Sequence, residues 1–246
     1  MLGTFAGFWF WYFTKAEPFL VGPAVFVASL AGGMALYRFL IEPVSKGYRG
    51  DLNTLIITYG MSIFLSNLAR LAWTTEPKAT SAPANIIKLW GTAVSVPRII
   101  SSLFALFVVI ILYLFLKITP TGKAIRAVSQ NREGALAIGI DVSYVSTLAF
   151  GIGIGLSCLA GTLVSEFFAS QPYMGTSFVV LSFAIIILGG MGSFKGLLAG
   201  AVVLSFISQL GSYLIGSAWR SFIFFLIIII VLIIRPTGIV KTVKLI

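Results

Sequence analysis

Long runs without a charged residue constrain this chain more than any other feature. The stretch from Ile99 to Leu116 has no charged side chain, and as a helix it would extend about 27 Å, close to the thickness of a bilayer core. The apolar residues come in blocks and do not alternate, which excludes a membrane β-barrel. The sequence therefore predicts an all-α, polytopic transmembrane helix bundle. Its seven complete spans are Phe19–Tyr37, Asn53–Ala69, Ile99–Leu116, Tyr144–Val164, Ser177–Met191, Leu197–Ile215 and Ser221–Ile234.

Composition supports a single membrane domain. The chain is 59% hydrophobic and only 10% charged, and no linker or shift in composition divides it, so we expect one transmembrane domain over residues 1–246. Leu2 to Phe13 is apolar and aromatic but spans only about 18 Å as a helix, too little to cross the bilayer. We expect a partial N-terminal span there. Our hypothesis is that the natural start lies upstream or that the chain is a shortened form.

The basic residues follow the expected membrane topology. A net charge of +10 is also typical of nucleic-acid-binding proteins. When the seven spans are threaded through the membrane in order, however, most Lys and Arg residues fall on one side of the membrane. This positive-inside bias predicts a multi-pass protein of a prokaryotic cell membrane with residues 117–143 and the C-terminus in the cytoplasm. No nucleic-acid partner is expected. The residues on that side are Arg38, Lys46, Arg49, Lys117, Lys123, Arg126, Arg132, Lys195, Arg235, Lys241 and Lys244.

The segment from Thr121 to Ile140 is a charged amphipathic island between apolar runs. Placed on one helix at about 100° per residue, it has a polar side and an apolar side, and only Arg132 breaks the pattern. Two interpretations remain open: a docking element for a soluble partner, or an amphipathic loop lying in the headgroup region. The polar side holds Lys123, Arg126, Gln130 and Glu133, and the apolar side holds Ala124, Ile125, Val128, Ala135 and Leu136.

Most enzyme chemistry is excluded by composition. With no histidine, one cysteine and seven acidic residues, the chain has neither a metal-ligand cluster nor a Ser-His nucleophile, and Gly122-Lys123 is followed by Ala124, where a phosphate-binding loop needs Ser or Thr. The acidic residues fall at or beyond span ends, and we expect Glu166 to be a solvated interfacial carboxylate. We therefore predict no catalytic residue, metal or cofactor, and a transport protein that takes its energy from a partner or acts passively.

Small and polar residues recur at helical spacing. The span from Asn53 carries a polar stripe whose members either line a solute path or make hydrogen bonds between helices; the path candidates are Thr58, Ser62, Ser66 and Asn67. Glycines at four-residue steps are typical of close helix packing; they are Gly151 and Gly155, then Gly192, Gly196 and Gly200. Ser193 is a candidate N-cap for the helix that follows it.

Several motifs, taken in order, resemble one family. The stretch REGALAIG, Arg132 to Gly139, is similar to the coupling loop of ABC importers, with Glu133, Ala135 and Gly139 matching. Together with IEPVSKGYRGDLNTLIITYGMSIFLSNLARL, TPTGKAIRAVSQNREGALAIGI, PYMG, LGGMGSFKG and RPTG, it makes the whole chain resemble the permease subunits of branched-chain amino acid ABC importers. The family's opening helix and its Asn-Phe-Ala-His-Gly motif are missing, and Lys195 stands where the family usually has proline.

The resemblance implies a heteromeric importer. Its partners would be cytoplasmic ABC ATPase subunits, a second permease that is identical or homologous, an extracytoplasmic solute-binding protein and membrane lipid. The path would also include Thr176 and Ser177, beyond the Pro172–Gly175 turn. Three alternatives remain open: a permease for urea, amides or another small solute, a passive channel or structural membrane subunit, and a membrane enzyme. The residues implied to couple to the ATPase are Lys123, Arg126, Gln130, Arg132, Glu133 and Gly139.

Overall fold

The computed structural model describes most of the chain. The described residues are 1–45, 47, 50–80, 86–89, 92–190, 192–216, 226, 229 and 233. The predicted span 221–234 and the RPTG motif at 235–238 lie essentially outside them, as do Lys46, Arg49, Arg235, Lys241 and Lys244 among the residues assigned to one side. The chain divides into two compact units, Met1–Met174 and Gly175–Ile246, which are described separately. That the chain is a single permease domain therefore stays a prediction.

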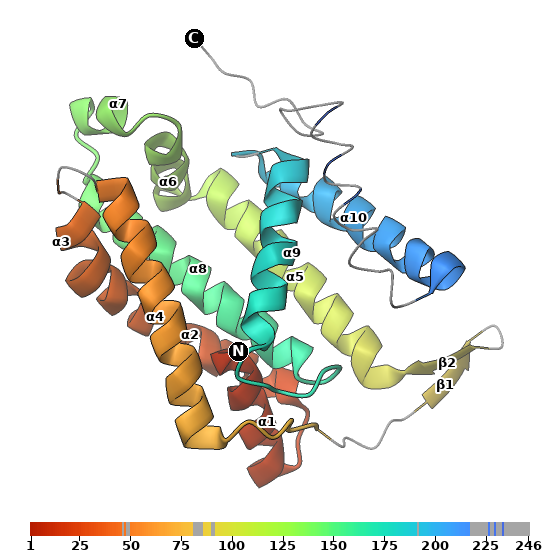
Figure 1. Cartoon of the computed structure of the whole chain (residues 1–246). Helices are drawn as coiled ribbons and strands as arrows, with labels where there is room; N and C mark the ends of the chain where they lie inside the picture. The colour runs from red at the N-terminus through yellow and green to blue at the C-terminus, as the bar shows by residue number, and fades with distance from the viewer. Residues whose placement is uncertain are drawn as a thin grey trace. The chain divides into compact units, whose positions relative to one another are not determined.

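The first unit is a set of helices with one small hairpin (Figure 1). The predicted all-α, polytopic class is confirmed. The segment from 73 to 98, whose sequence is poor in apolar runs, also holds an antiparallel hairpin of β1 Ile86–Leu89 and β2 Thr92–Ser95, with Ile86 paired to Ser95. The helices are α1 Leu2–Thr14, η1 Pro18–Val21, α2 Gly22–Leu36, η2 Tyr37–Ile41, α3 Glu42–Ser45, α4 Gly50–Trp73, α5 Val96–Ile118, α6 Pro120–Gln130, α7 Arg132–Ala137 and α8 Val142–Val164.

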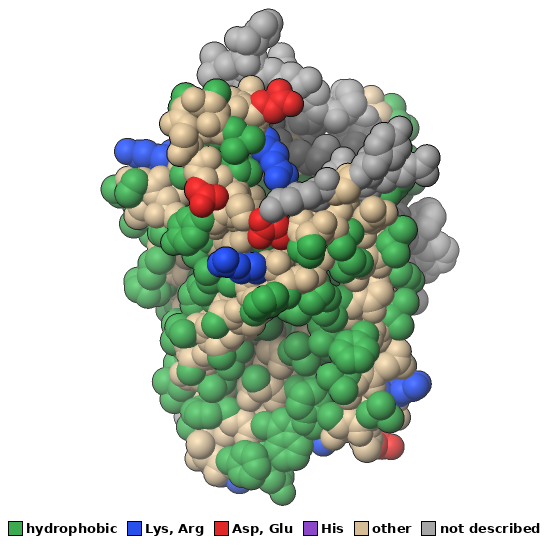
Figure 2. Space-filling view, turned by 90° about the vertical axis from the view of Figure 1, so that its left-hand side faces the viewer, with side chains coloured by type: hydrophobic (Ala, Val, Ile, Leu, Met, Phe, Trp, Pro, Cys, Tyr) green, Lys and Arg blue, Asp and Glu red, His purple; other side chains and the backbone are tan. Residues whose placement is uncertain are grey.

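Five helical stretches among the described residues are long and apolar enough to cross a membrane: Pro18–Ser45, Leu52–Trp73, Val96–Ile118, Val142–Val164 and Phe194–Gly211. The first of them joins α2, the π-helix η2 and α3 into one continuous rod. Helix α9, Met174–Gly189, has 16 residues and a length of about 24 Å, shorter than the bilayer core. The count of seven complete spans therefore stays a prediction. Figure 2 shows hydrophobic side chains over the middle of the visible face and charged ones toward its ends.

Helices α2 and α8 form the closest packing in the first unit (Figure 1). Glycines lie where their backbones meet. A Cβ added to Gly33 would lie 2.9 Å from Ile154 Cβ and 3.1 Å from the Cα of Gly151, and one added to Gly155 would lie 2.9 Å from the Phe26 ring. Because small residues let two backbones approach, the glycines allow α2 and α8 to pack with their backbones in close contact.

Helix α1 packs on the other end of α8 in the same way. The backbone of Gly3 lies against the carbonyl of Cys158, and a Cβ added to Gly161 would lie 3.0 Å from the amide nitrogen of Thr4. Phe5 is fully buried and stacks on Trp73 at 4.7 Å between ring centroids, which ties the end of α4 to α1. The predicted partial N-terminal span is thus a packed helix of the unit.

The second unit contains α9 and α10, Phe194–Ile215. Its core is Ala184, Leu188 and Leu204, and the two helices approach where a Cβ on Gly200 would lie 3.0 Å from the amide nitrogen of Gly189. Ser193 caps α10 as predicted, because its Oγ accepts a hydrogen bond from the Gly196 amide at 3.1 Å. The expectation that Gly192 continues a packing row with Gly196 and Gly200 is wrong. Gly192 precedes the helix, is exposed and has φ +88°, a turn conformation that glycine permits.

Two adjacent glycines in α2 give a matched test of the α2–α8 contact. Gly33→Ala should lower the free energy of unfolding by about 1–3 kcal/mol, because the new methyl group meets Ile154 and the backbone of Gly151. Gly32→Ala, with nothing within 4 Å of its added Cβ, should be neutral or slightly stabilising. Thermal unfolding of the detergent-solubilised variants measures the difference, and equal melting temperatures would contradict the close contact.

Candidate functional site

The segment predicted to dock a partner is not one helix. It folds as α6 and α7 with a break at Asn131, whose φ of −151° and ψ of 104° are extended. The prediction of a single amphipathic helix through Ile140 is therefore wrong, and so is the placement of Leu136 on the packed side, because Leu136 is 56% exposed. Helical phase does not continue across an extended residue, which resets the direction of every later side chain.

Side chains and turns fix both short helices. Thr119 Oγ1 accepts a hydrogen bond from the Gly122 amide at 3.0 Å and caps α6, and Asn131 Oδ1 accepts one from the Gly134 amide at 2.8 Å and caps α7. Helix α7 ends in a Schellman turn at Gly139, which has φ +82°, with the Ile140 amide donating to the Ala135 carbonyl at 3.0 Å. Sequence analysis missed the role of Asn131, although Asn before a helical turn is a known N-cap signal.

The α6–α7 element exposes both charge and apolar surface. It packs on α5 and α8, with Ala135 only 3% exposed, and its predicted coupling residues all lie on the surface. Leu136 and Ile138, 56% and 74% exposed, lie beside Glu133 in sequence. Among the residues the structure describes, none of the charged members has an ion-pair partner. The exposed predicted residues are Lys123, Arg126, Gln130, Arg132, Glu133 and Gly139.

The predicted path residues of α4 are bonded to their own helix. Thr58 Oγ1 donates to the Thr54 carbonyl at 2.8 Å, and Asn67 Nδ2 donates to the Ile63 carbonyl at 2.9 Å. Ser62 is exposed, while Ser66 is partly buried. Within the described part of the chain, the polar stripe therefore shows no hydrogen bond to another helix. Helix α4 is packed mainly at its ends, and much of its length, polar and apolar alike, faces outward.

The remaining predicted path residues belong to the second unit. Thr176 and Ser177 lie in the first turn of α9, and both are exposed. The structure describes them within the second unit, apart from the α4 stripe, which belongs to the first.

Glu42 and Ser143 join two helices at the α6–α7 end of the first unit. Ser143 is the second residue of α8, and its Oγ donates a hydrogen bond to Glu42 Oε1 in α3 at 2.5 Å, a length typical of a hydroxyl bonded to a carboxylate. The carboxylate also lies near the N-terminus of α8, where the helix dipole favours negative charge. Sequence analysis did not identify this pair, because the two residues are 101 positions apart.

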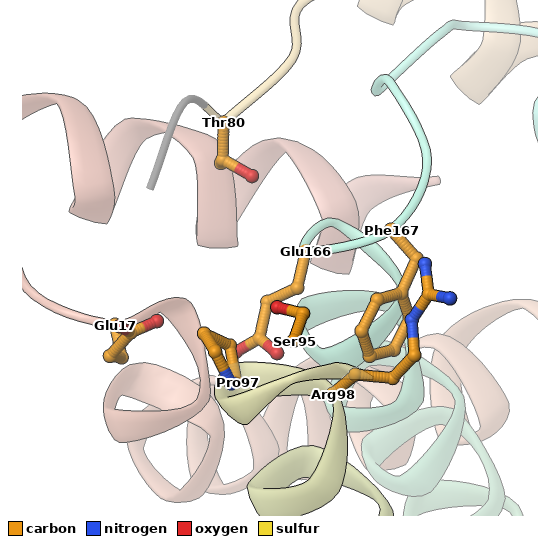
Figure 3. A pocket seen from close by; sticks show the side chains of 7 residues that line it. All are labelled: Glu17, Thr80, Ser95, Pro97, Arg98, Glu166 and Phe167. Carbon is orange, nitrogen blue, oxygen red and sulfur yellow. The ribbon is translucent and has the colours of Figure 1, made fainter. Parts of the chain in front are cut away.

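A small pocket lies at the opposite end of α8 (Figure 3). Glu166 was expected to be a solvated carboxylate, but it is partly buried, and its Oε2 accepts a hydrogen bond from Ser101 of α5. Figure 3 shows the Glu166 side chain lying beside Ser95. The backbones of Lys78 and Ser170 pair as in an antiparallel sheet. The Lys78 amide donates to the Ser170 carbonyl at 3.1 Å, and the Ser170 amide donates to the Lys78 carbonyl at 2.8 Å.

Burial raises the pKa of Glu166, which lies beyond the last residue of α8, above its ordinary value of 4.5. The hydrogen bond from Ser101 opposes this change, and the neighbouring Glu17 carboxylate adds to it. Glu166 Oε1 and Glu17 Oε2 are buried oxygens with no hydrogen-bond partner among the described residues. These surroundings therefore favour the protonated form of Glu166.

The bundle and its exposed, capped α6–α7 element define a class: a helical multi-pass membrane protein with two short, exposed helices at one end. A family described as "Branched-chain amino acid transport system / permease component" matches residues 1–232. The chain belongs to this permease family. No solved structure gives a significant match to the chain.

Several curated relatives are similar over most of their length. The high-affinity branched-chain amino acid transport system permease protein LivH of Salmonella typhimurium is 29% identical over 223 residues, which cover 88% of this chain and 71% of LivH. BraD of Pseudomonas aeruginosa is 30% identical over 227 residues, covering 88% and 73%. The probable LivH permease of Methanocaldococcus jannaschii is 26% identical over 237 residues, covering 90% and 74%. These matches support a multi-pass membrane protein of a prokaryote.

Permeases of this family are subunits of ABC importers, in which separate chains hydrolyse ATP and bind the solute. The chain is a transport subunit and not an enzyme. The predicted resemblance is thereby confirmed, and the urea, channel and structural alternatives are not favoured.

The raised pKa of Glu166 predicts a pH-dependent stability. A carboxyl whose pKa is raised by folding contributes stability that is fully present below about pH 4.5 and is lost as the pH rises through the folded value. Glu166→Gln removes the ionisation and should therefore melt at a higher temperature than the wild type near neutral pH, with the difference vanishing below about pH 4.5. Thermal unfolding across this pH range is the measurement, with Glu76→Gln, an exposed carboxylate, as control. A pH-independent difference would refute the assignment.

Proposed function

We propose that this chain forms the membrane-spanning path for branched-chain, hydrophobic amino acids and couples it to ATPase subunits through the α6–α7 element. The observation that carries the proposal is the exposed, doubly capped α6–α7 element on the end of a membrane helix bundle. The named substrates of LivH and BraD support the solute class. The scarcity of acidic groups at membrane depth agrees with energy supplied by a partner.

The α6–α7 element has the chemistry of a docking surface for a cleft that presents acidic groups to its basic residues and a basic group to Glu133. Lys123, Arg126 and Arg132 give it positive charge, and Glu133 sets a single carboxylate beside the exposed Leu136 and Ile138. Apolar side chains supply buried area at an interface, whereas surrounding charges select the partner and its orientation. The caps at Thr119 and Asn131 hold this surface in one shape before docking, which lowers the entropy cost of binding.

The solute path in this proposal runs along the polar side of α4. Thr58, Ser62, Ser66 and Asn67 supply weakly polar groups without charge, and Thr176 and Ser177 add hydroxyls from α9. A path for apolar amino acids needs no strong binding group, since a separate solute-binding protein sets selectivity. The exposed length of α4 is the surface that a second permease, identical or homologous, would cover, while lipid covers the remaining apolar surface.

The proposed orientation follows from charge. The basic α6–α7 element faces the cytoplasm and the ATPases, the C-terminus lies on the same side, and the Glu166 end of α8 faces the solute-binding protein.

Reversal of the single docking carboxylate tests the coupling role. Glu133→Lys should abolish ATP-driven uptake in proteoliposomes or reduce it at least tenfold, because a positive charge would face partner groups selected for a negative one. The neutral Glu133→Gln serves as the matched control and should lose less activity. Normal uptake by Glu133→Lys in an assembled complex would exclude Glu133 from docking.

A bulky apolar side chain in the polar stripe of α4 tests the proposed solute path. Ser62→Leu should reduce the maximal uptake rate several-fold, because it narrows and dries the polar side of α4, while ATPase association is retained. Ile56→Leu, a volume-conserving change on exposed apolar surface of the same helix, is the control and should transport normally. Initial rates of labelled leucine uptake provide the measurement, and unaltered rates for Ser62→Leu would remove the stripe from the path.

A further inference from the structure

The α7–α8 junction is a rigid joint. Only residues 138–141 separate the two helices, and both sides of this connection are fixed by hydrogen bonds. Gly139 closes α7 in its left-handed turn, and Asp141 Oδ1 accepts a hydrogen bond from the Tyr144 amide at 3.0 Å to cap α8. A displacement of α7 is therefore passed to the first turn of α8, which contains Ser143.

The described residues around the α3–α4 connection also make close contacts. Ser45 Oγ donates to the Glu42 carbonyl at 2.9 Å, the Gly50 amide donates to the Gly47 carbonyl at 3.0 Å, and the Cα of Gly50 approaches the Ser45 carbonyl so closely that only glycine fits. Helix α4, which carries the polar stripe, starts at this glycine. Movement of Glu42 is thus passed to the start of α4.

A change in helix type precedes Glu42. Residues Tyr37–Ile41 form a π-helix between α2 and α3, and π-segments are local irregularities that often mark functional positions in membrane helices. Tyr37 contacts Phe150 of α8 at 5.6 Å between ring centroids, so α8 supports the π-helix from one side. Directly after this irregular turn, the Glu42 carboxylate bonds to Ser143.

We infer that the Ser143–Glu42 hydrogen bond transmits movement of the α6–α7 element to α4. Ser143 and Glu42 are therefore positioning residues for coupled transport. This inference rests on the proposed function, in which the ATPases move α6–α7. The bond is a charge-assisted link between the first turn of α8, which follows the docking element, and α3, which contacts the proposed path helix α4. Without it, α8 is joined to α3 and α4 only indirectly among the described residues, through its packing on α2 and through the irregular η2 turn.

The test uses the complete importer, with its ATPases and solute-binding protein, in proteoliposomes. Ser143→Ala should lower the amount of leucine taken up per ATP hydrolysed by about tenfold, the effect on an equilibrium of losing one charge-assisted hydrogen bond. ATP hydrolysis and co-purification of the ATPases should stay at wild-type levels. Ser143→Thr keeps the hydroxyl and should restore most of the ratio. Glu42 makes other interactions too, so Ser143 is the cleaner site to change.

A control and a pair of variants isolate the bond itself. Ser157→Ala removes a hydroxyl from the same helix, where, among the described residues, Oγ bonds to the Gly153 carbonyl at 2.8 Å within its own helix, and should leave the ratio unchanged. Ser143→Ala combined with Glu42→Ala should transport no less per ATP than Glu42→Ala alone, because the two changes break one bond.

The outcomes separate the inference from the proposed function. A wild-type uptake-to-ATP ratio in Ser143→Ala overturns the inference alone, as does loss of ATPase co-purification in that variant, which would assign Ser143 to docking. A wild-type permease that never associates with an ATPase overturns the proposed function and the inference with it.

Discussion

The contact between the backbones of α2 and α8 is the constraint on which the first unit depends. Gly33, Gly151 and Gly155 bring the two helices within the distance that only a missing side chain allows. In lipid, helix association gains little from hydrophobic burial, so close packing of backbones has to supply much of the stability. A helix pair packed in this way resists bending between its ends, so a displacement at one end of α8 is transmitted along the helix.

The two ends of α8 carry opposite kinds of polar chemistry. At its start, Asp141 caps the helix and Ser143 bonds to Glu42, so negative charge lies where the helix dipole favours it. Beyond its last residue, Glu166 lies partly buried near another carboxylate, where ionisation is disfavoured. The first arrangement joins α8 to α3 through a hydrogen bond, whereas the second favours the protonated form of Glu166. The two ends of the same helix thus place a carboxyl group in different environments.

Much of this fold is readable from the sequence, because the apolar runs are long and the membrane admits few structures. The Ser193 cap and the exposure of Lys123, Arg126 and Glu133 were predicted from local pattern. The break at Asn131 was not, because helical periodicity treats each residue alike and Asn competes for the backbone only where a cap forms. The Glu42–Ser143 and Glu166–Ser101 bonds were also missed. Pairs so distant in sequence leave no spacing signal in a single chain.

The distribution of charge limits where work can enter this protein. The acidic residues fall at or beyond the predicted span ends, so an ion gradient has no obvious carboxylate to act on within the bilayer. Force from outside the membrane must then be applied to an end of the bundle. In the function proposed above, that end is the one with the capped helices α6 and α7, their exposed charges and the hydrogen bond from Ser143 to Glu42. In the same proposal, transport along the weakly polar groups of α4 requires only that this helix be moved.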